Sequence, residues 1–207
     1  MALKFRKNLR KRRTLRRANR RGRRPYSRRY SRGAMVMKRT FDWGTFNSDV
    51  TGTLSYASTF SINSLPNISE VTNLFDMYKI TKITVKMYPI NPNVSTANVY
   101  RILSAVDYND AATPTSASIR ELGNMRVHML HNDRGFCSRT FKPSVLDTVY
   151  NTSISDGYAT SKPAPWISTA YPNVPHYSLK LYGEGFPVST GLFRADVTIY
   201  MAVKNVH

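Results

Sequence analysis

The sequence has little cysteine, no long apolar run and no acidic residue near its N-terminus, and each absence excludes a class of protein. Its 207 residues include one cysteine, Cys137, which rules out an internal disulfide framework and a multi-cysteine zinc site. The chain lacks the run of about 18 apolar residues that a transmembrane helix needs, so we expect no membrane insertion. No apolar stretch follows the basic N-terminus, so we expect no secretory signal. Phosphate-binding glycine motifs are also missing.

Acidic residues are absent from the first 39 residues, which hold 18 of the 31 Lys and Arg residues, 14 of them Arg. Residues 40–207 hold 13 basic and 12 acidic residues and are nearly neutral. A segment as charged and as poor in apolar residues as 1–39 cannot bury enough surface to fold alone. We therefore predict a disordered basic arm at 1–39 and a folded domain at 40–207.

Arginine dominates the arm, and its chemistry points to nucleic acid. The planar guanidinium group pairs bidentately with phosphate and stacks on bases, which the lysine ammonium does not do. Binding of this kind depends steeply on salt and little on base sequence, and tyrosines can add stacking on unpaired bases. The predicted nucleic-acid-binding residues are Arg6, Arg10, Lys11, Arg12, Arg13, Arg16, Arg17, Arg20, Arg21, Arg23, Arg24, Arg28, Arg29 and Arg32, with Tyr26 and Tyr30.

A basic arm can also serve in protein targeting. Basic runs are sufficient for nuclear import, and the residues predicted to form such a signal are Arg10, Lys11, Arg12, Arg13, Arg16 and Arg17. This role is compatible with nucleic-acid binding. A mitochondrial presequence needs an amphipathic apolar face, and the arm offers only a thin one.

The folded part shows apolar residues at every second position, which is typical of β-strands. The clearest alternation places Phe193, Ala195, Val197, Ile199, Met201 and Val203 on one face and Arg194, Asp196, Thr198, Tyr200 and Lys204 on the other. A second places Ile83, Val85 and Met87 opposite Lys82, Thr84 and Lys86. Eight strands are predicted, near 36–46, 54–62, 82–88, 98–107, 125–131, 135–142, 176–183 and 193–204.

Short helices are predicted at 68–76, with Asn67 or Ser69 as a cap, and at 115–122. Asn132 to Gly135 favours a tight hairpin between the flanking strands. Residues 144–175 contain four prolines and are predicted to form a long functional or interfacial loop. Eight strands with long connections favour an all-β, eight-stranded antiparallel jelly-roll sandwich, with an immunoglobulin-type sandwich as the alternative.

Residue types that carry catalysis or bind metals are not grouped. His128 and His131 are three apart in a predicted strand and so on opposite faces, which favours surface histidines over metal ligands. Asp107 and Asp110 follow a strand and could bind a cation, although acidic turns are common. Cys137 has no catalytic partner in the sequence, which indicates a structural thiol. We predict no catalytic site, metal or cofactor, and hence no enzyme.

Four segments resemble the capsid proteins of circovirus-like viruses, which encode a Rep protein and carry circular single-stranded DNA. The four segments follow one another in the order expected for those proteins. Together with the Arg-rich arm, they span nearly the whole chain. The segments are Leu74–Pro89, with Phe75, Tyr78 and a basic alternating strand that ends at Tyr88-Pro89; Ser104–Asp110 with Pro114; Phe141-Lys142-Pro143; and the closing strand Val197–Lys204.

The resemblance implies a single jelly roll with strands lettered B to I. It implies a homo-oligomer of 60 copies that forms a small icosahedral shell with T=1 symmetry. The arm would face inward, bind the single-stranded DNA genome and engage the nuclear import machinery. The protein would occupy the virion and, during assembly, the host nucleus. The shell would also mediate attachment to a host cell-surface receptor and entry.

The residues alone leave three classes of function open. The first is a self-assembling coat protein. The second is a monomeric nucleic-acid-binding module, ribosomal or chromatin-like, with a basic tail; such a module usually carries basic and aromatic residues on its folded surface as well. The third is a cupin-type metal enzyme, which needs clustered His and Glu ligands that the four scattered histidines do not supply. The near-neutral folded part favours the coat protein.

Overall fold

The computed structural model describes residues 33–90, 100–130, 136–151, 156–160 and 164–206. By its contacts the chain divides into units Met1–Gly33 and Ala34–His207. The first strand begins at Met35, so it includes the last five residues of the segment predicted as the arm. No described helix has the length and hydropathy that a membrane span requires.

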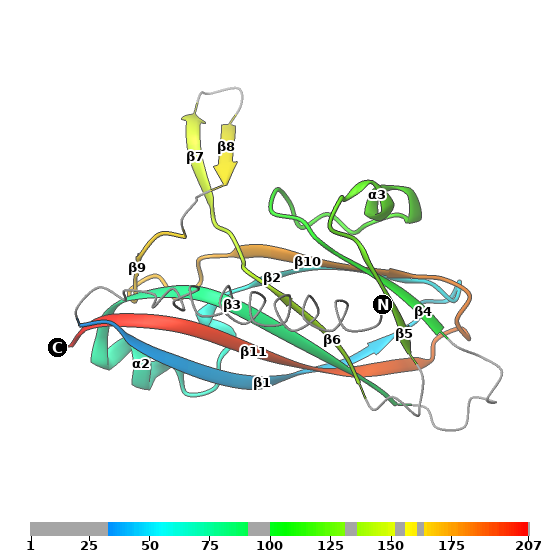
Figure 1. The fold of residues 1–207 in the computed structure, drawn as a ribbon, viewed down its shortest axis with the longest axis horizontal. Coiled ribbons are helices and arrows are strands. Elements are labelled where there is room, and N and C mark those ends of the chain that lie inside the picture. Colours follow the sequence, from blue (N-terminus) through cyan, green and yellow to red (C-terminus); the bar gives the residue numbers. More distant parts are fainter. Residues whose placement is uncertain (1–32, 91–99, 131–135, 152–155, 161–163, 207) are drawn as a thin grey trace, which may run out of the picture. The chain divides into compact units, whose positions relative to one another are not determined.

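Two antiparallel sheets face each other (Figure 1), and together they contain all eight predicted strands. The first has the order β1-β11-β3-β6, formed by Met35–Asn47, Gly191–Val206, Phe75–Pro89 and Cys137–Phe141. The second has the order β2-β10-β4-β5, formed by Leu54–Phe60, His176–Gly183, Tyr100–Val106 and Arg126–Leu130. Lettered B to I along the chain, the sheets read BIDG and CHEF, which is the jelly roll. The predicted fold class is confirmed, and the immunoglobulin-type alternative is not adopted.

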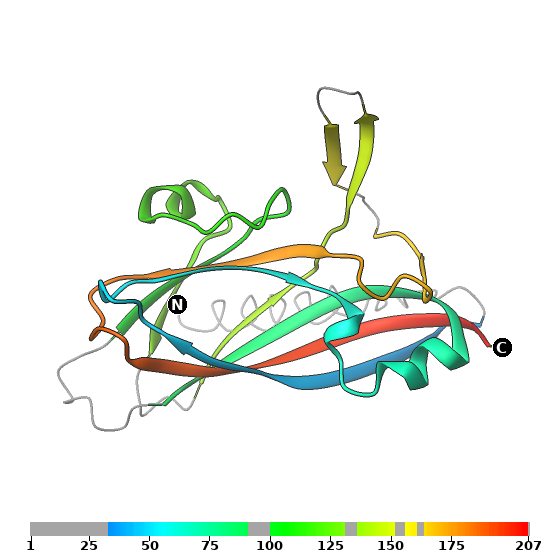
Figure 2. The same cartoon turned by 180° about the vertical axis from the view of Figure 1, so that it is seen from behind.

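The core lies between the two sheets and is built largely by β3 and β11, the two longest strands. Seen from behind, β1, β11 and β3 run side by side, and β2 and β10 form the layer facing them (Figure 2). Along β11, the side chains from Phe193 to Val203 that were predicted to share a face are all 0% exposed. Ile83, Val85 and Met87 of β3 are equally buried. Burial of such a side chain contributes about 1.5–3 kcal/mol, so this pair of strands supplies much of the driving force for folding.

Two sequence predictions about connections were wrong. The segment 144–175 is not a plain loop, because it contains β7 (Leu146–Asn151), β8 (Asp156–Thr160) and β9 (Ile167–Ser168). Its prolines are confined to residues from 163 onward, and the β-branched and aromatic residues before them favour strand. The strands flanking 132–135 do not form a hairpin, since β5 pairs with β4 and β6 pairs with β3. The turn residues themselves lie outside the described residues.

Both predicted helices are present, and the second covers part of a sheet. The first is α2, Ile68–Leu74, which follows a short 3₁₀ turn, η1, at Ile62–Ser64. Asn67 is its N-cap residue but makes no capping bond through its side chain. The second is α3, Ser116–Glu121, with a capping box in which Thr115 accepts from the Ser118 backbone N–H at 3.2 Å. Ile119 of α3 packs on Leu103 and Ala105, so β4 is covered on both faces.

The loop that carries α3 is tied to the second sheet by a buried lysine. The Lys180 ammonium of β10 lies 2.8 Å from a carboxylate oxygen of Asp107 and 2.6 Å from one of Asp110. Burial alone would lower the pKa of Lys180, but hydrogen bonds to the two carboxylates outweigh it and raise the pKa. The cation that these aspartates bind is therefore the chain's own lysine side chain.

His128 and His176 are both buried, and for His128 this corrects the expectation of a surface histidine. His128 exchanges a 2.7 Å hydrogen bond with Ser104, and His176 lies 3.0 Å from the Val174 carbonyl through Nδ1. Burial lowers the pKa of both rings below 6.5, and in His128 the nearby Arg139 and Arg126 lower it further. The spacing in the sequence placed His128 and His131 on opposite faces of the strand. It did not show that the face with His128 points into the sandwich. His131 lies outside the described residues.

We predict that Lys180→Met destabilises the fold by about 3–5 kcal/mol, because it leaves the Asp107 carboxylate buried without its cation. The side chain of Asp107 is 10% exposed, whereas that of Asp110 is 53% exposed. Asp110→Asn should therefore cost only about 1 kcal/mol. Unfolding in denaturant measures the free energy of unfolding of both variants. Lys142→Met, a substitution of an exposed lysine, is the control. Equal losses in the two variants would contradict this role of Lys180.

We also predict that stability falls when the pH drops from 7.5 to 5. The folded state holds both buried histidines neutral, while the unfolded chain protonates them near 6.5, so their contribution is complete above that pH and is lost below it. The lowered pKa of Asp42, Asp49 and Asp110 matters only below their usual value of 3.8. Thermal unfolding of the wild type should show this fall, and the double variant His128→Gln/His176→Gln should be flatter. An unchanged slope in that variant would count against the histidines.

Candidate nucleic-acid interface

The residues predicted from the arm, including the nuclear-localisation residues, span Arg6 to Arg32 and lie outside the described residues. They therefore stay predictions. What the structure describes is where the arm's chain enters the folded domain: at Met35, in the edge strand of the β1-β11-β3-β6 sheet. A strand of nucleic acid bound by the arm would therefore pass close to that sheet.

Six basic side chains lie on the surface of this sheet that points away from the core. We call this surface the basic face. On β3, β11 and β1 the residues between the buried ones alternate outward, and the ladder registers place them on one surface. The six are Lys38, Lys79, Lys82, Lys86, Arg194 and Lys204.

The basic face holds a charge excess that the whole domain does not show. Two carboxylates, Asp42 and Asp196, share this surface, and the third in these strands, Asp76, lies on the opposite face together with Tyr78. Asp42 forms an ion pair with Arg194, and hydrogen bonding from that guanidinium lowers the pKa of the carboxyl. Residues 33–207 contain 15 basic and 12 acidic residues in total. With six basic and two acidic groups, this face is more positive than the domain as a whole.

One cross-strand row joins two lysines through an aromatic ring. Lys38 of β1 and Lys82 of β3 are both register partners of Tyr200 on β11. Their ammonium nitrogens lie 6.0 and 3.8 Å from the centre of the tyrosine ring. Cation–π contacts of this kind hold the long lysine side chains against the sheet. The row therefore presents fixed positive charge beside a half-buried ring.

The next row consists of threonines from four neighbouring strands. The hydroxyl oxygens of Thr40 and Thr198 are 2.9 Å apart, and those of Thr84 and Thr140 are 3.0 Å apart. Such pairs stabilise adjacent strands and fix their register. They also make the centre of the face uncharged and polar.

At each end of the face, a further lysine packs on an aromatic ring. Lys86 lies 4.8 Å from the centre of the Phe136 ring, which also packs on Tyr88. Lys204 lies 4.8 Å from the ring of Trp166. Positive groups that track a phosphate backbone, interleaved with rings on which bases stack, are the features of single-stranded nucleic-acid sites.

Sequence reasoning did not predict this surface. The outward residues of β3 and of β11 were each recognised as a polar face, but only the pairing of Tyr200 with Lys82 joins them into one. The near-neutral total of residues 40–207 concealed the excess, because the compensating acids lie elsewhere. The signal present in the sequence was the repetition of basic residues on the polar side of two apolar strands.

The described residues contain no group of three or more His, Cys, Asp or Glu that could hold a metal ion. Cys137 donates through its thiol to the Met129 carbonyl at 3.3 Å and lies beside the core. This contact fits the structural thiol predicted from the sequence.

Comparisons with known proteins agree with the jelly roll. A family model described as circovirus capsid protein matches residues 4–207. A crystal structure of the 60-mer BFDV capsid protein has a TM-score of 0.67 at 16% identity and covers 85% of this chain and 96% of that one. A crystal structure of the decameric BFDV capsid protein has a TM-score of 0.56 at 16% identity and covers 83% of this chain and 99% of that one. The structure of Cocksfoot mottle virus has a TM-score of 0.53 at 12% identity and covers 84% of this chain and 96% of that one. None of the curated proteins matches this sequence.

We predict that replacing Lys38, Lys82 and Lys86 by Gln weakens binding of a single-stranded DNA oligonucleotide. Each lost phosphate contact lowers the slope of log affinity against log salt by about 0.7, so the slope should fall by about 2. The fold should be retained, because all three side chains point to solvent. Fluorescence anisotropy over a salt series measures the slope.

The matched control removes three charges from the other sheet and its covering helix, as Arg101→Gln, Arg120→Gln and Arg126→Gln. Its slope should stay close to that of the wild type. If both triple variants lose the same amount, net charge alone governs binding and the basic face has no special role.

Proposed function

The chain belongs to the circovirus capsid protein family, and from this premise we propose that its copies assemble into a closed icosahedral shell that packages single-stranded DNA through the Arg-rich arm. Proteins of this family are structural coat proteins, which agrees with the prediction that the chain is not an enzyme. It is a viral capsid protein, not a ribosomal or chromatin-like module. Everything finer than this is proposed from the residues.

The observation that carries the packaging proposal is the division of charge along the chain. The first 32 residues hold 16 basic residues and no acidic one, and the chain then enters the sheet whose outer surface is the basic face. An arm of this length could extend about 100 Å. Arm and face would thus bind the same strand of DNA, the arm by phosphate contacts and the face by phosphate contacts and stacking.

Assembly into 60 copies is proposed from the fold and from its solved neighbour, the BFDV 60-mer. The arms of 60 copies would bring on the order of 1,000 positive charges into one lumen, and they would repel one another without a polyanion. Assembly is therefore coupled to nucleic acid in this proposal, and DNA longer than the arms can neutralise would retain small cations.

The same arm would serve nuclear import through Arg10–Arg13, Arg16 and Arg17 before assembly hides it. Virion and host nucleus are accordingly the proposed locations. Attachment to a host cell-surface receptor is proposed for the outer surface of the shell.

We predict that deletion of residues 2–32, which leaves β1 intact, gives particles free of nucleic acid or no particles at low salt. The reason is that the deletion removes 16 basic groups without touching the described sheets. The ratio of absorbance at 260 and 280 nm, measured on particles purified by density gradient, reports the packaged acid.

The matched control replaces Arg6 and the 12 arginines from Arg10 to Arg32 by lysine. This keeps the positive charge and removes the guanidinium groups. It should still package nucleic acid, with weaker retention in high salt. Particles of the deletion variant that hold a normal genome content would contradict the proposal.

A further inference from the structure

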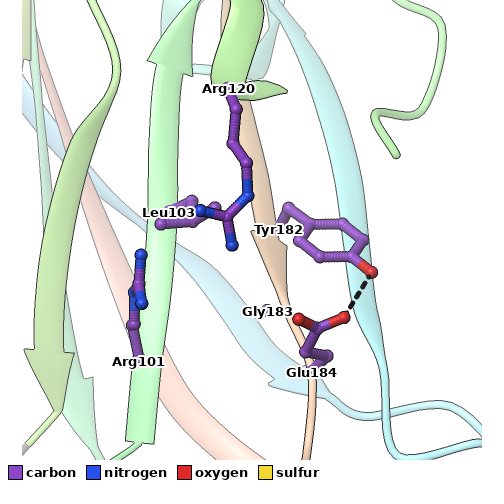
Figure 3. Close-up of a pocket in the computed structure, with 6 residues that line it drawn as sticks. All are labelled: Arg101, Leu103, Arg120, Tyr182, Gly183 and Glu184. Carbon is purple, nitrogen blue, oxygen red and sulfur yellow. Dashed lines mark hydrogen bonds between the residues drawn. The ribbon is translucent and has the colours of Figure 1, made fainter. Parts of the chain in front are cut away.

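A small pocket lies on the outer surface of the β2-β10-β4-β5 sheet, where α3 meets it. Its lining comes from β4, α3, β10 and the residue after β10, and its cavity volume is about 60 Å³. Figure 3 shows the guanidinium of Arg120 reaching from α3 toward the space between Arg101 on β4 and Tyr182 on β10. The lining residues are Arg101, Leu103, Arg120, Tyr182, Gly183 and Glu184.

The two guanidinium groups have donors to spare. Arg120 donates through Nε to the Ser116 hydroxyl at 3.4 Å, which orients the group, and no other described residue forms a hydrogen bond with its terminal nitrogens. Within the described part of the chain, no carboxylate lies within ion-pair distance of Arg101 or Arg120. Two arginines that share a pocket without an acidic partner form a ready binding site for an anion.

The one acidic group in the lining is already engaged. The Glu184 carboxylate accepts a 3.1 Å hydrogen bond from the Tyr182 hydroxyl. Burial and the neighbouring Glu184 raise the pKa of Tyr182, so the hydroxyl remains a donor at neutral pH. With two cations and one anion, the pocket keeps a net positive charge.

The walls are held by packing rather than by the ligand. Leu103 is 3% exposed and forms the floor, and Ile119, at 0%, anchors α3 against it. Gly183 has no room for a side chain, because an added Cβ would meet the Phe186 ring at 2.6 Å and the Arg101 carbonyl at 3.1 Å. The backbone segments that position the two arginines are therefore fixed by packing.

We propose that this pocket binds a tetrahedral oxyanion, phosphate or sulfate, either as the free ion or as the terminal group of a larger molecule. Its volume is far below the roughly 300–1,000 Å³ of a site for a drug-sized ligand, so one such group fills it. Planar guanidinium groups bind oxyanions in bidentate fashion, and two from different elements can clamp one group.

The pocket is separate from the nucleic-acid interface. It opens on the CHEF sheet, whereas the basic face belongs to the BIDG sheet on the other side of the core. If the proposed function holds and the basic face contacts the genome, the oxyanion is supplied from the opposite side of the shell wall.

The test measures the thermal unfolding of the full chain in inorganic phosphate or inorganic sulfate against chloride at equal ionic strength. Ligands that bind the native state raise its melting temperature in a saturable way. Sulfate and phosphate also stabilise proteins generally, without saturation. Comparison of variants removes that general effect together with binding to the arm, since every variant keeps residues 1–32.

The wild type and the control Lys142→Gln should show a saturable rise of a few degrees at millimolar anion. Arg101→Gln/Arg120→Gln should lose it, and Arg101→Lys/Arg120→Lys should show a smaller one. Glu184→Gln should reach saturation at lower anion concentration, which gives a second readout if the double Gln variant folds poorly. Equal saturable rises in the double Gln variant and the control, or no saturable rise in the wild type, would overturn the proposal.

Binding of a single-stranded DNA oligonucleotide keeps this proposal distinct from the proposed function. The double Gln variant should bind it as tightly as the wild type does. A selective loss of DNA affinity in the double variant would assign the pocket to the genome interface and overturn the inference of a separate site.

Discussion

Antiparallel pairing of β3 with β11 is the constraint on which the rest of the structure depends. Successive side chains of a strand point to opposite faces, so the same register that buries the apolar residues of both strands commits the intervening lysines to the outer surface. The core and the basic face are thus two sides of one pairing. A slip by one residue would bury Lys82 and Lys86 and expose Ile83 and Val85, which explains why the register is strongly specified.

The two sheets of the sandwich present different chemistry on their outer surfaces. The BIDG sheet carries lysines, threonines and aromatic rings, and the arm is attached to its edge strand. The CHEF sheet is partly covered by α3, which Lys180 and the two aspartates hold in place, and it carries the arginine pocket. In the proposed function, the BIDG sheet faces the genome and the CHEF sheet faces outward, and the different chemistry of the two sheets fits these two roles.

The fold could be predicted from the sequence where period-two alternation is strong, as in 193–204, and where local residue types favour a short helix, as at 115–122. The hairpin at 132–135 was mistaken because a turn signal shows that the chain reverses but not which sheet receives the next strand. The basic face and the arginine pocket were missed for the same reason. Arg101 and Arg120, or Tyr200 and Lys82, are far apart in sequence, and only strand pairing and helix docking bring them together.

Ultraviolet cross-linking of packaged DNA to the protein, followed by mapping of the modified peptides, tests the central claim most directly. The account predicts cross-links in residues 1–32 and at aromatic residues of the basic face, such as Tyr200 and Tyr88, and none around Tyr182 on the other sheet. Cross-links concentrated at α3, β4 and β5, with the arm and the basic face unmodified, would contradict it.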